Sequence, residues 1–125
     1  MGLLDRWFDQ TDWPRDPRLD IFRDGVWELS LDGEVKGWLT TSVNIMRGRP
    51  LFWVKQEQMW YQTHWLDGTH GFPEEDYGPA WYAVKELRAG KFEGRYPESD
   101  QDAWFEAAPL TGFERDRLWD ALKHG

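Results

Sequence analysis

Hydrophobic and polar positions alternate near the start of the chain and predict a β-hairpin. In residues 25–31, every second position is apolar, which is the period of a strand with one buried face. The pair Asp32-Gly33 follows, then a second β-forming run at residues 35–43, and Asp and Gly tolerate the positive φ of a tight turn. The apolar residues expected to share the buried face are Trp27, Leu29, Leu31, Val35 and Trp38.

The pattern in residues 51–66 is less regular, because its apolar positions fit neither the helical nor the strand period well. The content of Trp, Tyr, Val and Thr favours two short strands over a helix. Asp67-Gly68 then predicts a turn that ends the last of these strands.

After residue 78 the period becomes helical. Pro79 suits the first position of a helix that Gly90 ends, with a buried stripe made of Ala80, Trp81, Val84 and Leu87. A second, short helix is expected to start at Ser99-x-x-Asp102 and to stop at Pro109, with Trp104 and Phe105 pointing inward.

The two ends of the chain also predict helices. Thr111-x-x-Glu114 is a capping box, and it opens a C-terminal helix whose buried side is Phe113, Leu118, Ala121 and Leu122. Residues 2–10 form a short amphipathic pattern, and the prolines at 14 and 17 then imply an extended connector over residues 11–20.

Strands followed by helices predict the α+β class. We expect one domain over residues 1–125, with an antiparallel sheet of about four strands from the N-terminal half. The C-terminal helices and a short N-terminal helix would pack on this sheet. At 125 residues the chain is long enough for one hydrophobic core.

The composition is unusual in its ten Trp residues, joined by seven Phe and four Tyr. Large rings bury much area per residue, so most of them are expected in the core. Trp and Tyr also anchor protein interfaces, which leaves a binding face as the alternative. Trp-rich surfaces stack on sugars too, but carbohydrate-binding modules are typically secreted all-β domains, unlike the α+β chain expected here.

Acidic residues dominate one part of the sequence. The net charge is −8, and residues 67–110 hold ten acidic and four basic residues, which accounts for six of the eight excess negative charges. Such a surface repels nucleic acid and anionic membranes and attracts basic proteins. The alternative is that the acids serve solubility alone.

Several classes of chemistry lack their residues. The chain has no cysteine, which excludes disulfides, thiolate catalysis and Cys-based zinc sites. No nucleophile elbow, P-loop, dinucleotide fingerprint or HExxH motif is present, so no cofactor and no catalytic residue are assigned. No apolar run approaches the roughly 20 residues of a membrane helix, and the N-terminus lacks the features of a secretory signal. We therefore expect a cytoplasmic protein.

His64, Asp67 and His70 are spaced three residues apart, and two histidines with a carboxylate can form a metal triad. On a strand these three positions do not share a face, so no metal site is assigned. A strand-end histidine more commonly hydrogen-bonds a backbone group. The alternative function is a small enzyme or ligand-binding domain with its pocket around Trp60, His64, Asp67 and His70.

A partner-binding surface is the leading hypothesis. Aromatic residues flank the acidic cluster at 74–76 within a segment rich in Gly and Pro, and loops of this kind commonly carry function. Rings would supply affinity, and acids would supply steering toward a basic partner. The residues assigned to this surface are Trp65, Asp67, Phe72, Glu74, Glu75, Asp76, Tyr77, Glu98, Asp100 and Asp102. The competing interpretation is a solvated acidic turn whose aromatics fill the core beneath it.

In size, acidity and lack of a catalytic motif, the chain resembles two groups of small acidic proteins. These are the bacterial immunity proteins that neutralise basic toxin nucleases and the phage inhibitors of host defence, including anti-CRISPR proteins. No matched motif carries the likeness, so no residue role is transferred. It implies a non-enzymatic inhibitor or adaptor that binds a basic, nucleic-acid-handling protein and does not bind nucleic acid itself.

Overall fold

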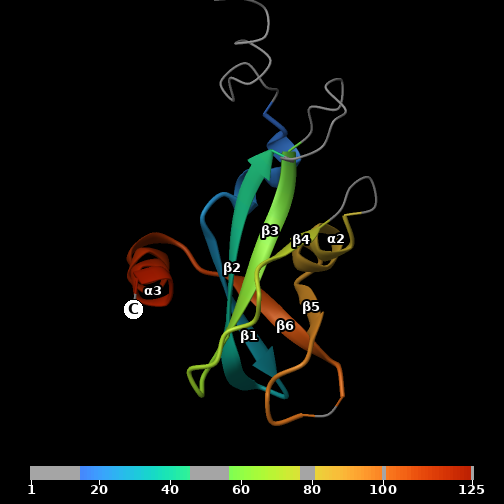
Figure 1. Cartoon of the computed structure of the whole chain (residues 1–125), viewed down its shortest axis with the longest axis vertical. Helices are drawn as coiled ribbons and strands as arrows, with labels where there is room; N and C mark the ends of the chain where they lie inside the picture. Colours follow the sequence, from blue (N-terminus) through green and yellow to red (C-terminus); the bar gives the residue numbers. More distant parts are fainter. Residues whose placement is uncertain (1–14, 46–56, 77–80, 100, 125) are drawn as a thin grey trace, which may run out of the picture.

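One six-stranded antiparallel sheet forms the centre of the structure, a computed structural model that describes residues 15–45, 57–76, 81–99 and 101–124 (Figure 1). The strand order across the sheet is β4-β3-β2-β1-β6-β5. The strands are β1 (Gly25–Leu31), β2 (Glu34–Ile45), β3 (Glu57–Trp65), β4 (Glu74–Asp76), β5 (Lys91–Gly94) and β6 (Ala103–Pro109). The helices are η2 (Pro17–Phe22), a 3₁₀-helix, and two α-helices, α2 (Tyr82–Arg88) and α3 (Gly112–His124).

The hairpin prediction is confirmed. Strands β1 and β2 pair through the turn at Asp32 and Gly33, whose φ angles are 52° and 81°. The predicted face is only partly right, since Trp27 stands opposite Leu39 and Trp38 lies on the other face. A β-bulge between Leu29 and Ser30 is the cause, because one extra residue in a strand moves every following side chain to the opposite face.

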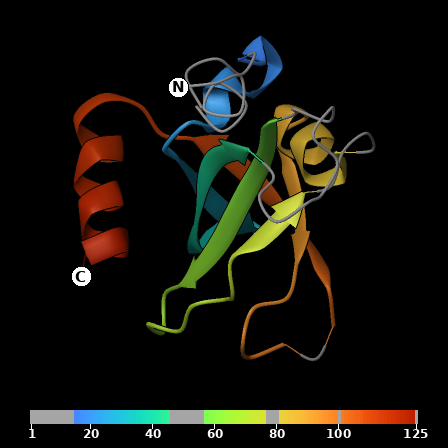
Figure 2. The ribbon, with the colours of Figure 1, turned by 45° about the horizontal axis from the view of Figure 1, so that its top comes forward.

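The sheet curls into a half-barrel whose inner face holds the core (Figure 2). Ring contacts connect strands across the curl. The ring centroids of Trp65 in β3 and Phe105 in β6 are 5.5 Å apart, and those of Tyr61 in β3 and Phe92 in β5 are 5.7 Å apart. These strands are separated by about 30 to 40 residues of chain, so the contacts are long-range. The core cluster of buried residues is Leu19, Phe22, Trp27, Leu29, Leu39, Met59, Trp65, Trp81, Ala83, Val84, Leu87, Phe92, Phe105 and Ala107.

The predicted fold class is wrong in its proportions. The structure is mostly sheet with few short helices, and three of the six strands, β4, β5 and β6, come from the second half of the chain. The segment expected to be a helix over residues 99–109 contains β6, which lies between β1 and β5. Its side chains have the strand period, with Phe105 and Ala107 buried and Trp104 and Glu106 exposed.

The C-terminal helix is confirmed, but its expected packing on the core is not. Helix α3 stands on the opposite side of the sheet from α2 (Figures 1 and 2). Phe113 is 82% exposed, Ala121 is exposed, and Leu118 and Leu122 are only half-buried. Within the described part of the chain, no helix is long and apolar enough to cross a membrane.

Trp81, Val84 and Leu87 of the predicted stripe are buried, and helix α2 begins at Tyr82. Pro79 and Ala80 lie outside the described residues. The carboxylate of Asp76 accepts the Val84 N–H at 2.8 Å, which satisfies one of the free donors of the first turn of α2. The predicted helix over residues 2–10 and the strand expected to start at residue 51 lie outside the described residues.

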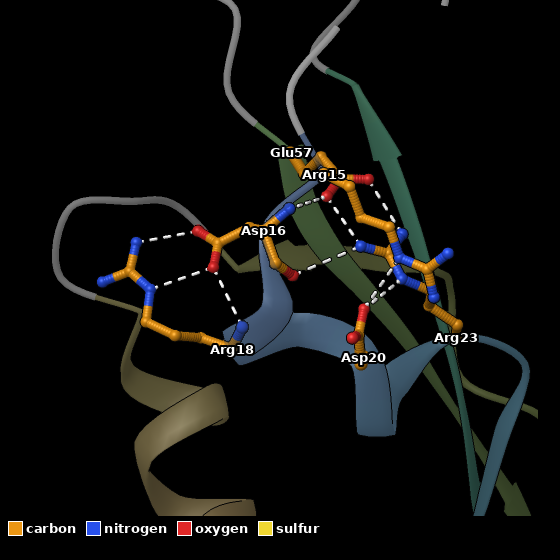
Figure 3. Close-up of polar contacts among 6 residues, drawn as sticks. All are labelled: Arg15, Asp16, Arg18, Asp20, Arg23 and Glu57. Atoms are coloured by element: carbon orange, nitrogen blue, oxygen red, sulfur yellow. Dashed lines mark hydrogen bonds and ion pairs between the residues drawn. The ribbon is translucent and has the colours of Figure 1, made fainter. Parts of the chain in front are cut away.

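Helix η2 replaces part of the expected extended connector, and an ion-pair network attaches it to β3 (Figure 3). Arg23 donates to both carboxylate oxygens of Glu57, at 2.8 and 2.7 Å. Glu57 also accepts the backbone N–H of Asp16 at 2.6 Å, and Arg23 donates to Asp20 at 2.8 Å. The hydrogen bonds from Arg23 are the main reason that the pKa of Glu57 is lowered. All six residues of the network have partners within it, which indicates a structural role.

Candidate functional site

The inner face of the half-barrel is hollowed where β3 approaches β5. We call this hollow of about 250 Å³ the β3–β5 groove. One wall carries residues of β3, β4 and the loop between them, and the other wall carries β5. Its lining residues are Tyr61, Thr63, Trp65, Gly71, Phe72, Glu74, Phe92, Glu93, Gly94 and Arg95.

A second, smaller hollow of about 140 Å³ adjoins the groove at Trp65, which lines both. We call it the Tyr96 hollow. It lies where the loop after β3 meets the loop after β5, and both loops leave the sheet at the same end of the molecule (Figures 1 and 2). Its lining residues are Lys36, Trp65, Leu66, Asp67, Tyr96, Pro97 and Glu98.

Aromatic rings build the floor shared by the two hollows. Trp65 is 8% exposed and packs against Phe105, while its ring centroid lies 6.3 Å from that of Tyr96. Gly37 of β2 makes room for Trp65, because a Cβ at this position would lie 2.9 Å from its Cε3 atom. Phe72 is 90% exposed and stands on the rim of the β3–β5 groove.

Acidic residues also line the two hollows. Glu74 and Glu93 line the groove, and Asp67 and Glu98 line the Tyr96 hollow. The same linings contain two cations, and each pairs with a further acid at 3.2 Å. These pairs are Arg95–Asp102 and Lys36–Glu34. Six carboxylates thus stand against two cations, so the region carries a net charge of −4.

Two local contacts show how these groups behave. Burial, followed by interaction with the Glu74 carboxylate, raises the pKa of Tyr61, so its hydroxyl remains a proton donor. Lys36 places its Nζ 5.4 Å from the centre of the Tyr96 ring. An aromatic face beside carboxylates is a favourable position for a cation, and Tyr96 already attracts one from its own chain.

Six of the ten residues predicted for partner binding lie in or beside the two hollows. Trp65, Asp67, Phe72, Glu74 and Glu98 all line the groove or the Tyr96 hollow. Asp102 joins them through its ion pair with Arg95. Asp67 also accepts the N–H and hydroxyl of Thr69, at 2.9 and 2.6 Å, which shapes the loop that bears it.

The remaining predicted residues do not join this site. Asp76 is buried and caps α2. Glu75 stands opposite Trp60 in the ladder between β3 and β4, so its side chain leaves the sheet on the outer face. Tyr77 and Asp100 lie outside the described residues. The acidic run 74–76 is therefore not one surface, since neighbouring strand residues point to opposite faces.

Sequence reasoning missed the wall formed by β5 and the residues after it. Phe92, Glu93, Arg95 and Tyr96 all contribute to the hollows. The alternation of polar and apolar residues in Lys91–Gly94 was a usable strand signal, but four residues are too few to establish a period.

The histidines form a separate contact on the outer face. The Nδ1 atoms of His64 and His70 lie 2.8 Å apart, and His64 Nε2 lies 2.8 Å from the Thr40 hydroxyl. His64 is 2% exposed, and burial, His70 and Lys123 together lower its pKa to about 4. The contact ties the loop after β3 to the sheet, because His64 and His70 also form a β-bridge.

Of Trp60, His64, Asp67 and His70, Asp67 alone lines one of the two hollows described above. The Asp67 carboxylate binds Thr69, and neither hollow is lined by Trp60, His64 or His70. Among the described residues, no group of three His, Cys, Asp or Glu side chains is placed to hold a metal ion. The geometry lends no support to the alternative of a small enzyme or ligand-binding domain around these residues.

No protein-family model matches the chain, and no curated protein or solved structure matches it either.

Proposed function

We propose that this chain is a non-enzymatic, cytoplasmic binding protein that captures a basic region of another protein in the β3–β5 groove and the Tyr96 hollow. The observation that carries the proposal is the ring of carboxylates around aromatic surface. Glu74, Asp67 and Glu98 line the two hollows together with Trp65, and Glu93 lines the groove at strand β5. Arginine and lysine fit such a surface, because rings and carboxylates both attract them.

The proposed action is occlusion. Arg and Lys side chains that contact phosphate in a nucleic-acid-handling protein would instead pair with these carboxylates. The charge of the chain supports this choice of partner, since a net charge of −8 accelerates encounter with basic proteins and disfavours contact with nucleic acid. The protein would then act as an inhibitor or adaptor.

Charge reversal tests the proposal. A groove variant carries Glu74→Lys, Glu93→Lys and Glu98→Lys, all at exposed positions. A control variant carries the same charge change away from the groove, as Glu106→Lys, Glu114→Lys and Asp120→Lys, also at exposed positions. Asp76 is left unchanged in both variants because it is buried and caps α2.

The wild type and both variants are immobilised and compared in capture from the native cell, with elution by rising salt. We expect the wild type and the control variant to retain the same basic protein, and the groove variant to lose it. Purified partner should then lose nucleic-acid binding when the wild type is added in stoichiometric amount. Equal retention by the groove variant would refute this site.

A further inference from the structure

Strand β5 is an edge of the sheet, and its free side lines the β3–β5 groove. Among the described strands it pairs with β6 alone, and Phe92, Glu93 and Gly94 all line the groove. Ala107 N–H donates to the Gly90 carbonyl at 2.9 Å, so the backbone of Gly90 faces β6. In an antiparallel ladder, backbone groups turn toward the neighbour at every second residue. The N–H and carbonyl of Glu93, three residues after Gly90, therefore turn away from β6.

A side chain now occupies the position that a neighbouring strand would take. The Glu93 N–H donates to a carboxylate oxygen of Glu86 in α2, at 3.5 Å. This distance is long for an N–H···O hydrogen bond. The carbonyl of an added strand could replace the Glu86 carboxylate at closer range.

The side chains beside this edge define what the added strand would carry. Glu93 stands opposite Trp104 on β6, and Trp104 is 53% exposed. A residue placed opposite Glu93 on an added strand would point its side chain to the same face of the sheet as Glu93 and Trp104. Arg or Lys at that position would meet a carboxylate and an indole ring. Its two neighbours in sequence would point to the inner face, toward the rings of Phe92 and Tyr61.

We propose that the captured segment binds in an extended conformation as a seventh strand, paired with the free edge of β5 at Glu93. Its pattern is a basic residue between apolar ones, with further basic residues toward Asp67 and Glu98 at the Tyr96 hollow. Main-chain hydrogen bonds give affinity in this mode, and alternate side chains give specificity. This inference rests on the proposed function, because it assumes that the groove binds a basic segment.

Backbone methylation separates strand pairing from simple charge attraction. The probe is a nine-residue peptide of alternating Val and Arg, compared with two versions methylated on the backbone nitrogen of either every Arg or every Val. Both versions keep all side chains and the full charge. In an added strand, only one of the two sets of N–H groups faces β5. When the added strand runs antiparallel to β5 with Arg opposite Glu93, methylation at Arg removes the donors that face β5.

We expect methylation at Arg to weaken binding by about tenfold or more, and methylation at Val to change it by about twofold at most, since each lost hydrogen bond contributes modestly. Titration calorimetry at low ionic strength measures both, and amide exchange of Glu93 should slow when the unmethylated peptide binds. If all three peptides bind alike and this exchange is unchanged, strand pairing is refuted while capture of basic segments stands. If none of them binds, the proposed function fails as well.

Discussion

Acidification should destabilise the fold through His64 before the carboxylates titrate. Burial is the largest cause of its low pKa, and the charges of His70 and Lys123 add to it. The pKa is about 4 in the folded chain, against an ordinary value of 6.5. Below pH 6.5 the unfolded chain thus binds a proton that the folded chain does not accept until about pH 4. The contribution of neutral His64 to stability is fully present above this pH window and is lost as the pH drops through it.

The size of the effect follows from the shift. One proton of difference gives a slope of about 1.4 kcal/mol per pH unit, so the loss from His64 is about 2 kcal/mol between about pH 7.5 and about pH 5. The other titratable groups with shifted pKa values change the stability at a lower pH or in the opposite direction. The lowered pKa values of Glu57 and Asp16 act only below their ordinary values of 4.5 and 3.8. Burial raises the pKa of Glu86, and its contribution has the opposite sign but is shared by all variants.

Urea denaturation at several pH values measures this loss in the wild type and in His64→Gln. Glutamine keeps an uncharged polar group near Thr40, and the variant should lose about 2 kcal/mol less than the wild type over the same pH range. His70→Gln is the control, and it should retain most of the pH dependence because burial is the main cause. Equal losses in the wild type and His64→Gln, or a His64 ring that titrates near 6.5 in NMR spectra, would refute the reasoning.

Two further predictions concern stability and are read by urea denaturation. Glu57→Gln breaks the two-bonded contact with Arg23, whose side chain is only 24% exposed, and should cost about 2–3 kcal/mol. Arg15→Ala, at an ion pair whose Arg side chain is 68% exposed, should cost less than about 1 kcal/mol, and equal costs would contradict the structural role of the network. Gly37→Ala should cost about 1–3 kcal/mol, because its Cβ would lie 2.4 Å from a backbone carbonyl oxygen of β3 and press on Trp65. An unchanged stability would show that Trp65 has room to move.

Local signals were sufficient for the elements that depend on local chemistry. The Asp32-Gly33 turn and the capping box at Thr111 each specify a backbone conformation within a few residues. The buried stripe of α2 has a regular helical period that remains legible although the helix is only seven residues long. These elements were predicted with the correct type, and the hairpin and α3 with nearly the correct bounds.

The rest depends on contacts between distant residues. Strand β6 contains Trp104 and Phe105 before Pro109, which suits a short helix as well as a strand over so few residues. Its state is decided by pairing with β1 and β5 and by the contact of Phe105 with Trp65. The β-bulge at Leu29 is likewise a feature of pairing, and it reversed the expected orientation of Trp38.

The candidate site also depends on contacts between distant residues, so the number of acids in a segment does not show which of them face the groove. Glu74 and Glu75 are neighbours in sequence, but the strand period sends Glu74 to the groove and Glu75 to the outer face. Glu98 reaches the same region because Tyr96 packs against Trp65, a contact across 31 residues. Acids that cluster in the sequence therefore do not share one face of the structure. The curl of the sheet selects which carboxylates face the aromatic floor, so variants of single acids should be chosen by strand face rather than by proximity in sequence.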